Sequence, residues 1–160
     1  MPPQKSSLKN KEKEVPDEFI RLMFERHAAI MLLIDPGTGE IIDANQAAVD
    51  FYGYPKSKLC TMLIDDINTL SPEQIAAERQ KAATEMRNHF IYRHRLASGE
   101  ERIVEVHASP IPFQDKQFLF SIIHDVTERM QLEEHLQKWE QTFKNARWGY
   151  CYQQSGWRIA

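Results

Sequence analysis

The residues most able to do chemistry in this sequence are its histidines, cysteines and neighbouring carboxylates. Zinc and iron sites are commonly marked by histidines one helical turn apart or by cysteines at short spacings. Neither pattern occurs among five of the histidines, which are His27, His89, His107, His124 and His135. The sequence therefore predicts no metal site.

Acid–base and nucleophilic chemistry also lack support. Asp65 and Asp66 are adjacent rather than on one face of a helix, so we interpret them as turn and cap residues. The chain has six glycines, and it contains no G-x-S-x-G, P-loop, H-E-x-x-H or glycine-rich nucleotide motif and no kinase or cyclase motif. We predict no catalytic residue and no enzymatic activity.

The candidates for binding a ligand are side chains that are predicted to point inward. His94 is the one histidine expected to face the interior, where it either hydrogen-bonds a polar ligand or is a structural group beside Arg102. Asn45 either reaches the same pocket or caps a helix, and the tyrosines either reach it or fill the core. The pocket candidates are Asn45, Tyr52, Phe90, Tyr92, His94, Val104 and Val106.

The composition limits the partners. Twenty basic and twenty-three acidic residues give a net charge of −3, which favours neither nucleic acid nor an anionic membrane. The longest apolar run, residues 28–34, is far shorter than the roughly 20 residues that span a bilayer, so we expect no membrane contact. Cys60 and Cys151 form no disulfide framework, which suits a cytoplasmic protein. Residues 1–16 are predicted to be a disordered leader.

The elements that must position these residues are, in the first half of the chain, a β-hairpin and several helices. Apolar residues at spacings of three and four predict an amphipathic helix over 17–28. Residues 30–35 and 40–43 flank a Pro-Gly turn and predict a β-hairpin. Asn45 and Gly53 are placed to begin and end a short helix, and Ser71-Pro72-Glu73 begins a longer one that reaches residue 86.

The second half of the chain predicts three strands. From residue 89 the apolar period becomes two, and a three-residue loop with Gly99 in the left-handed region would place Tyr92 opposite Val104 and Phe90 opposite Val106. A last strand is expected over residues 117–124, and its apolar runs 118–120 and 122–123 predict a central strand covered on both faces. Since the order of elements lacks the repeated strand-helix-strand alternation of a parallel sheet, the predicted fold class is α+β with an antiparallel sheet.

At this point the sequence resembles a known family. Its segments 43–48, 51–54, 93–99, 108–111 and 124–129 together resemble a PAS domain with its C-terminal PAC motif, over residues 29–126. The resemblance implies a five-stranded antiparallel sheet with helices on one face that enclose a small-molecule pocket. It also implies a place in bacterial sensor histidine kinases and diguanylate cyclases.

The cofactors that some relatives carry do not fit this sequence. A flavin photoreceptor of this family needs a reactive cysteine in N-C-R-F-L-Q, whereas the corresponding segment reads Leu59-Cys60-Thr61-Met62-Leu63-Ile64. A haem sensor usually takes its axial histidine from the long helix, and residues 71–86 contain none. The sequence therefore argues against flavin and haem and leaves any other ligand unidentified.

The last motif predicts how the domain ends. Asp125, Thr127 and Glu128 are the candidate transmission residues, because D-x-x-E is the spacing of a capping box that starts a helix, here residues 127–146, at the end of the last strand. Spacings of four and three along that helix form a coiled-coil seam of Leu132, Leu136, Trp139 and Phe143. The stripe either pairs two chains into a homodimer or packs back on its own sheet. Residues 147–160 resemble the start of a second, truncated PAS-like repeat.

Three hypotheses from different classes follow. The first is a ligand-responsive sensor that passes its signal through the C-terminal helix to an effector, a kinase or a diguanylate cyclase, elsewhere in a parent protein. The second is a homodimerisation scaffold whose interior is filled by side chains. An enzyme is the third and weakest class, since no catalytic motif supports it.

Overall fold

The centre of the structure is one antiparallel sheet. The computed structural model describes residues 15–84 and 88–154, with side chains up to residue 146. The strands are β1 (Ile30–Ile34), β2 (Ile41–Ala44), β3 (His89–Arg95), β4 (Glu101–Phe113) and β5 (Lys116–Asp125). Their order across the sheet is β2-β1-β5-β4-β3, and every pairing is antiparallel. The predicted five-stranded α+β fold is confirmed.

The register of the β3–β4 hairpin also agrees with the sequence. Tyr92 lies opposite Val104 and Phe90 lies opposite Val106. Gly99 adopts φ = +87°, the left-handed conformation that the three-residue loop requires. Alternation then places Phe90 and Val106 on the buried face and their neighbours in sequence on the other face.

β5 is the middle strand, as predicted, but its two faces are covered unequally. Leu119, Ser121 and Ile123 are buried, whereas the residues between them are half-buried. On the second face, Phe24 of helix α1 contacts Phe120, with ring centroids 6.4 Å apart. The prediction of full cover on both faces was therefore too strong.

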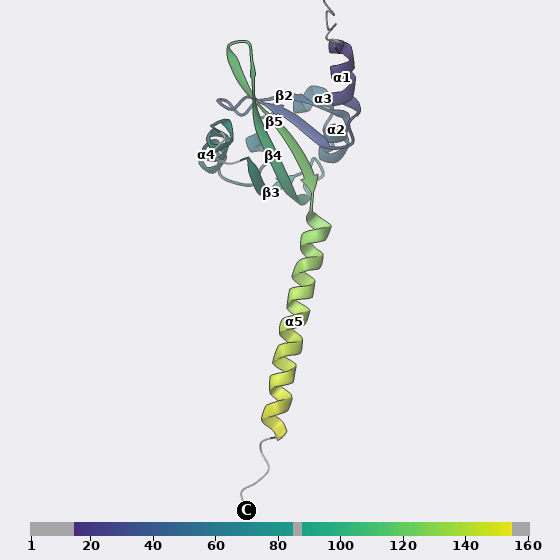
Figure 1. The fold of residues 1–160 in the computed structure, drawn as a ribbon, viewed down its shortest axis with the longest axis vertical. Coiled ribbons are helices and arrows are strands. Elements are labelled where there is room, and N and C mark those ends of the chain that lie inside the picture. Colours follow the sequence, from purple (N-terminus) through teal and green to yellow (C-terminus); the bar gives the residue numbers. More distant parts are fainter. Residues whose placement is uncertain (1–14, 85–87, 155–160) are drawn as a thin grey trace, which may run out of the picture.

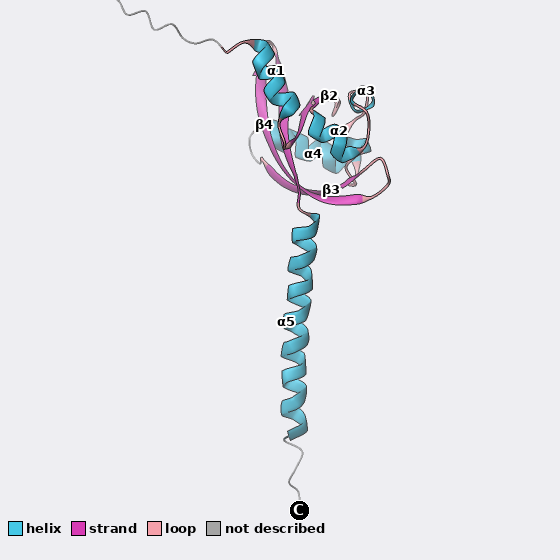
Figure 2. Ribbon diagram, turned by 90° about the vertical axis from the view of Figure 1, so that its right-hand side faces the viewer, coloured by secondary structure: helices cyan, strands magenta, loops and turns pink. Residues whose placement is uncertain are grey.

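The remaining elements are helices: α1 (Asp17–Arg26), α2 (Gln46–Tyr52), α3 (Lys56–Leu59), the 3-10 helix η1 (Ile64–Asp66), α4 (Pro72–Ala83) and α5 (Thr127–Gln154). The short helices α2 and α3, together with α4, cover one face of the sheet, and α5 extends away from the domain (Figures 1 and 2). The core lies between those helices and the sheet, and its largest fully buried side chains include Tyr52, Leu32 and Ile41.

Local capping explains where α2 and α4 begin and end. The Asn45 side chain accepts a hydrogen bond from the Ala48 N–H, and Gly53 ends α2 with φ = +75°. Ser71 and Gln74 form a reciprocal capping box at α4, with Pro72 at the first helical position. The caps predicted at Asn45 and Ser71 are confirmed.

Asn45 also ties the start of the sheet to α2. Its Oδ1 accepts from the Met31 N–H at 3.0 Å as well as from Ala48, and its Nδ2 donates to the carbonyls of His27 and Ala29. All of these bonds belong to a fully buried amide. A buried amide needs partners for its donors and its acceptor, and these backbone groups supply them. The Asn45 side chain therefore has a structural role in holding β1 and α2 together.

α5 is longer than the sequence predicted. It runs to Gln154, eight residues beyond the expected end at residue 146, so residues 147–154 continue the helix instead of forming the strand of a second repeat. The rest of that predicted repeat, residues 155–160, and most of the predicted leader, residues 1–14, lie outside the described residues. Among the helices of the described segments, none combines the length and apolar composition needed to cross a membrane.

Candidate functional site

A cavity of about 50 Å³ lies between α4 and the buried face of the sheet. Its wall is mostly apolar, with Ile75 and Ala82 from α4 facing Leu119 and Ile123 of β5. That volume holds a few water molecules. Most of the interior is therefore filled by side chains, and the remaining space is small.

The structure brings four of the seven pocket candidates to this cavity: Phe90, Tyr92, His94 and Val106. The other three do not line it. Asn45 is hydrogen-bonded to four backbone groups, and Val104 is fully buried elsewhere in the core. Tyr52 is fully buried and contacts the cavity only through its hydrogen bond to His94. Their assignment to the pocket is corrected, because alternation gives the face of a residue but not its distance from a void.

His94 is the polar centre of the cavity wall. Its side chain is 2% exposed, its Nδ1 lies 2.9 Å from the Tyr52 hydroxyl, and its Nε2 is buried without a hydrogen-bond partner. Arg102 is its cross-strand neighbour, but the guanidinium binds Glu100 and Asp125 instead. The structure thus does not bear out the alternative of a histidine satisfied by Arg102.

Burial fixes the charge of this pair. Desolvation lowers the pKa of His94 to about 3 and raises the pKa of Tyr52 above its usual range, so both groups are neutral near pH 7. The contact between the Tyr52 hydroxyl and His94 Nδ1 allows either group to donate. We assign the donor role to Tyr52, because the reverse arrangement would leave its own buried hydroxyl hydrogen without a partner among the described residues. The remaining nitrogen, Nε2, then carries the proton and is a donor available to a ligand.

Four further polar side chains line the cavity, Asn68, Ser121, Glu78 and Arg79, and the first two are buried. Asn68 Oδ1 accepts from the Leu70 N–H at 3.0 Å. Sequence reasoning missed all four residues. Ser121 could have been found, because it is the polar interruption of the apolar run in β5 and alternation places it with Leu119 on the buried face.

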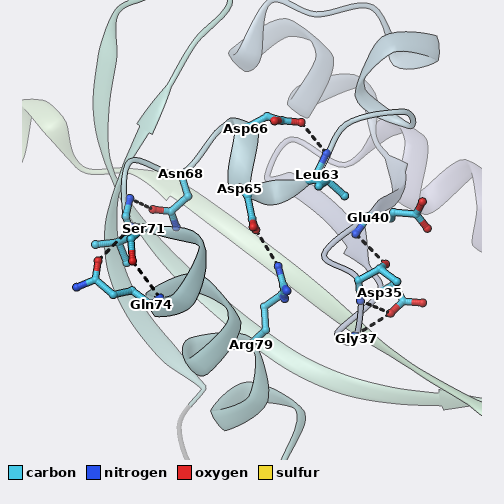
Figure 3. Close-up of polar contacts among 12 residues, drawn as sticks. Asp35, Gly37, Glu40, Leu63, Asp65, Asp66, Asn68, Ser71, Gln74 and Arg79 are labelled. Atoms are coloured by element: carbon cyan, nitrogen blue, oxygen red, sulfur yellow. Dashed lines mark hydrogen bonds and ion pairs between the residues drawn. The ribbon is translucent and has the colours of Figure 1, made fainter.

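An ion pair fixes α4 over the cavity. Arg79 Nη1 donates to Asp65 Oδ1 of η1 at 2.8 Å, and the two side chains are only 12% and 21% exposed (Figure 3). The guanidinium lies against Gly39, where an added Cβ would come within 2.1 Å of Nη1. Gly39 also has φ = +80°. The backbone conformation therefore favours glycine there, and a larger residue would also displace the guanidinium of Arg79.

The sheet passes into α5 through a junction without a loop. The Val126 N–H donates to the Ile103 carbonyl of β4, and the Ile103 N–H donates to Thr127 Oγ1, both at 2.9 Å. Asp125 Oδ1 accepts from the Thr127 N–H at 3.0 Å and from its hydroxyl at 2.6 Å. The first residue of α5 is thus bonded both to β4 and to the end of β5.

These contacts correct the predicted capping box. The helix begins at Thr127, two residues after Asp125, so Asp125 makes an Asx turn and not the N-cap contact three residues on. Within the described part of the chain, Glu128 forms no hydrogen bond back to Asp125. The direct passage from strand to helix is as predicted, but the bonds that make it are those of Thr127 and Ile103.

The predicted seam lies on the projecting part of α5. Leu132, Leu136, Trp139 and Phe143 are between 58% and 67% exposed. The rings of Trp139 and Phe143 touch each other, with centroids 6.0 Å apart. The alternative in which this stripe packs on its own sheet is wrong, because α5 leaves the domain (Figure 2).

Sequence spacing also missed a cluster of chemistry-bearing residues. His89 Nε2 and Glu105 Oε1 lie 2.8 Å apart, and His107 stacks on His89. His89 of β3 meets Glu105 and His107 of β4 across the strand pairing. The predicted pairing of Phe90 with Val106 already implied that His89 lies opposite His107, so the signal was present in the register.

The fold and the site together define a sheet-and-helix domain with a small interior cavity and a rigidly joined outgoing helix. The family model described as PAS domain matches residues 28–128. The chain belongs to the PAS domain family.

Relatives and solved structures agree with this assignment. The chain is 35% identical over 121 residues to the diguanylate cyclase DgcM of Escherichia coli strain K12, a match that covers 74% of this chain and 30% of the relative. It thus spans about 30% of the length of that curated relative.

Among solved structures, the PAS domain of an HTR-like protein from Haloarcula marismortui matches with 19% identity and a TM-score of 0.62, covering 68% of this chain and 89% of that chain. An RNA-binding Light-Oxygen-Voltage receptor matches with 16% identity and a TM-score of 0.68, covering 83% and 41% respectively. At these identities the two structures support the fold.

The buried state of His94 predicts a specific dependence of stability on pH. The unfolded chain binds a proton at this imidazole below about pH 6.5 and the folded chain does not until about pH 3, so the free energy of unfolding falls as pH falls through this window. The wild type should lose about 1.5 kcal/mol between pH 6.5 and pH 5 that His94→Gln retains. Urea denaturation at the two pH values measures this difference, and equal losses in the two proteins would contradict it.

Proposed function

We propose that this chain is a sensory module that binds a small molecule in the cavity beside His94 and passes the signal through α5 to an effector elsewhere in a longer protein. One observation carries the proposal, the buried Nε2 of His94 that has no partner in the described structure. An unsatisfied buried donor costs about 1–3 kcal/mol, and a ligand with a hydrogen-bond acceptor would recover this energy. The unsatisfied donor therefore lies at the place where the ligand would bind.

The lining limits the chemistry of the ligand. The wall is mostly apolar and also carries the polar side chains His94, Asn68, Ser121, Glu78 and Arg79. Such a lining suits a small, largely apolar molecule that carries a carbonyl, ether or similar acceptor. A volume of about 50 Å³ admits only a few heavy atoms while α4 stays in place. A larger ligand requires α4 to move outward, which would strain the contact between Arg79 and Asp65.

A contiguous set of contacts connects the cavity with α5. His94 lies opposite Arg102 in the β3–β4 ladder, and Arg102 Nη1 lies 3.3 Å from Asp125 Oδ2. Asp125 in turn accepts from Thr127, the first residue of α5. A ligand that displaces β3 would change this path only if it binds two states of the domain with different affinity.

The proposed effector is a diguanylate cyclase or a histidine kinase. The similarity to DgcM, a diguanylate cyclase of which this chain matches 30%, favours the first. The helix α5, which leaves the domain, is a suitable connection to a following domain.

We also propose that two chains pair through the seam of α5. Four large apolar side chains at heptad spacing are more than half exposed, which is costly for a helix that stays alone in water. The residues between them are polar or charged, as the outer surface of a two-stranded coiled coil requires.

Native mass spectrometry of protein purified from cells tests the ligand. The wild type should retain a small molecule, and His94→Phe should retain at least about tenfold less, because a lost hydrogen bond of about 1.4 kcal/mol corresponds to that factor. His135→Ala on the exposed surface of α5 is the control and should bind as the wild type does. If no molecule is retained and no compound in a thermal-shift screen raises the Tm, the filled scaffold is the better description.

Sedimentation velocity tests the seam. Replacement of both Leu136 and Phe143 by Glu places four carboxylates in the dimer interface and should give a monomer at concentrations where the wild type is a dimer. Gln137→Glu with Gln141→Glu adds the same charge at positions predicted to face solvent and should leave the dimer intact. An unchanged sedimentation coefficient in the first variant would rule out the seam.

A further inference from the structure

The face of the sheet opposite the cavity carries a cluster of ligand-type side chains. His89 lies on β3, and Glu105 and His107 lie on β4, with His89 directly opposite His107. Since Phe90 and Val106 point into the core, alternation places these three residues on the outer face. One imidazole nitrogen from each histidine and one carboxylate oxygen all lie within 4.8 Å of one another.

The three side chains already interact. The Nε2 atom of His89 contacts the carboxylate of Glu105 at 2.8 Å, and the rings of His89 and His107 stack with centroids 4.7 Å apart. The hydrogen bond from His89 lowers the pKa of Glu105, which keeps this carboxylate ionised. His124 of β5 lies opposite Glu105 in the ladder, and its ring is 6.2 Å from that of His107.

We propose that His89, Glu105 and His107 bind a divalent transition-metal ion of the Zn²⁺ type. Two imidazoles and a carboxylate are a donor set that suits Zn²⁺, Ni²⁺ or Cu²⁺ better than Mg²⁺ or Ca²⁺, which prefer oxygen ligands. The ion would take the place of the proton now shared between His89 and Glu105. His124 or water would complete the coordination.

The backbone geometry makes binding feasible with side-chain rotation alone. Donor atoms around tetrahedral Zn²⁺ lie roughly 3.4 Å apart, so the present separations of up to 4.8 Å must close by about 1.4 Å. The backbone positions are fixed by the continuous ladders on both sides of β4. His89 and His107 are exposed, so their rings turn without displacing core residues.

The site would also contact the outgoing helix. Arg129, in the first turn of α5, has its Nη2 3.9 Å from Glu105 Oε2. A bound cation would neutralise Glu105 and compete with this contact. Metal occupancy would therefore act on the same junction as the cavity, from the other face of the sheet and independently of any ligand at His94.

The test uses the untagged 160-residue chain, stripped of metal by a chelator and titrated with Zn²⁺ in a calorimeter. We expect one Zn²⁺ per chain. His89→Ala, His107→Ala and Glu105→Gln should each weaken binding roughly tenfold or more, since loss even of second-shell partners costs 10–100-fold. His135→Ala removes an exposed histidine outside the cluster and should leave the affinity unchanged.

Folding of the variants is checked by circular dichroism, and all three substitutions are on the solvent-facing side of the sheet. Zn²⁺ should also raise the Tm of the wild type and of His135→Ala but not that of His107→Ala. The proposal is overturned if the wild type binds no Zn²⁺ at micromolar concentration, or if His135→Ala loses as much affinity as His107→Ala.

Discussion

The rest of the structure depends on β5, which is paired along both edges and continues into α5. Its ladder with β4 runs from Val104 opposite Asp125 to the hairpin turn, and its ladder with β1 fixes the other edge. The Val126 N–H and the Thr127 hydroxyl then bond to Ile103, so the ladder of hydrogen bonds passes from strand to helix. Because only Val126 separates β5 from α5, we expect a change in sheet twist to change the direction of α5.

The interior is organised around a different constraint, the desolvation of His94 and Tyr52. Each is neutral because water is excluded, and their mutual hydrogen bond satisfies one polar atom of each. The second nitrogen of His94 is the part of this pair that a filled apolar core would not tolerate without cost. The proposed sensor would use this donor for selectivity, whereas a scaffold would gain nothing from it.

Much of this fold could be predicted from the sequence, because its signals are local. The alternation of apolar residues and the loop at Gly99 predicted that Phe90 lies opposite Val106. Asn45, a residue that commonly caps helices, predicted the start of α2. Features that depend on three-dimensional placement could not be predicted. Sequence spacing alone does not distinguish an N-cap from the Asx turn that Asp125 forms. Alternation along a strand gives the face of each residue, but it does not show that Ser121 lines the cavity and Val104 does not. The C-terminal end of α5 was also not predicted, because the aromatic residues after 146 are compatible with a strand as well as with a helix.

The most direct test of the rigid junction is hydrogen exchange of single amides, followed by NMR on the wild-type chain. The Ile103 and Val126 amides should be protected to the same degree as amides inside the β4–β5 ladder, because each donates to a partner across the junction. Exchange of these two amides at the rate of an exposed loop, with the ladder still protected, would show that α5 is hinged at Val126 and would contradict the account.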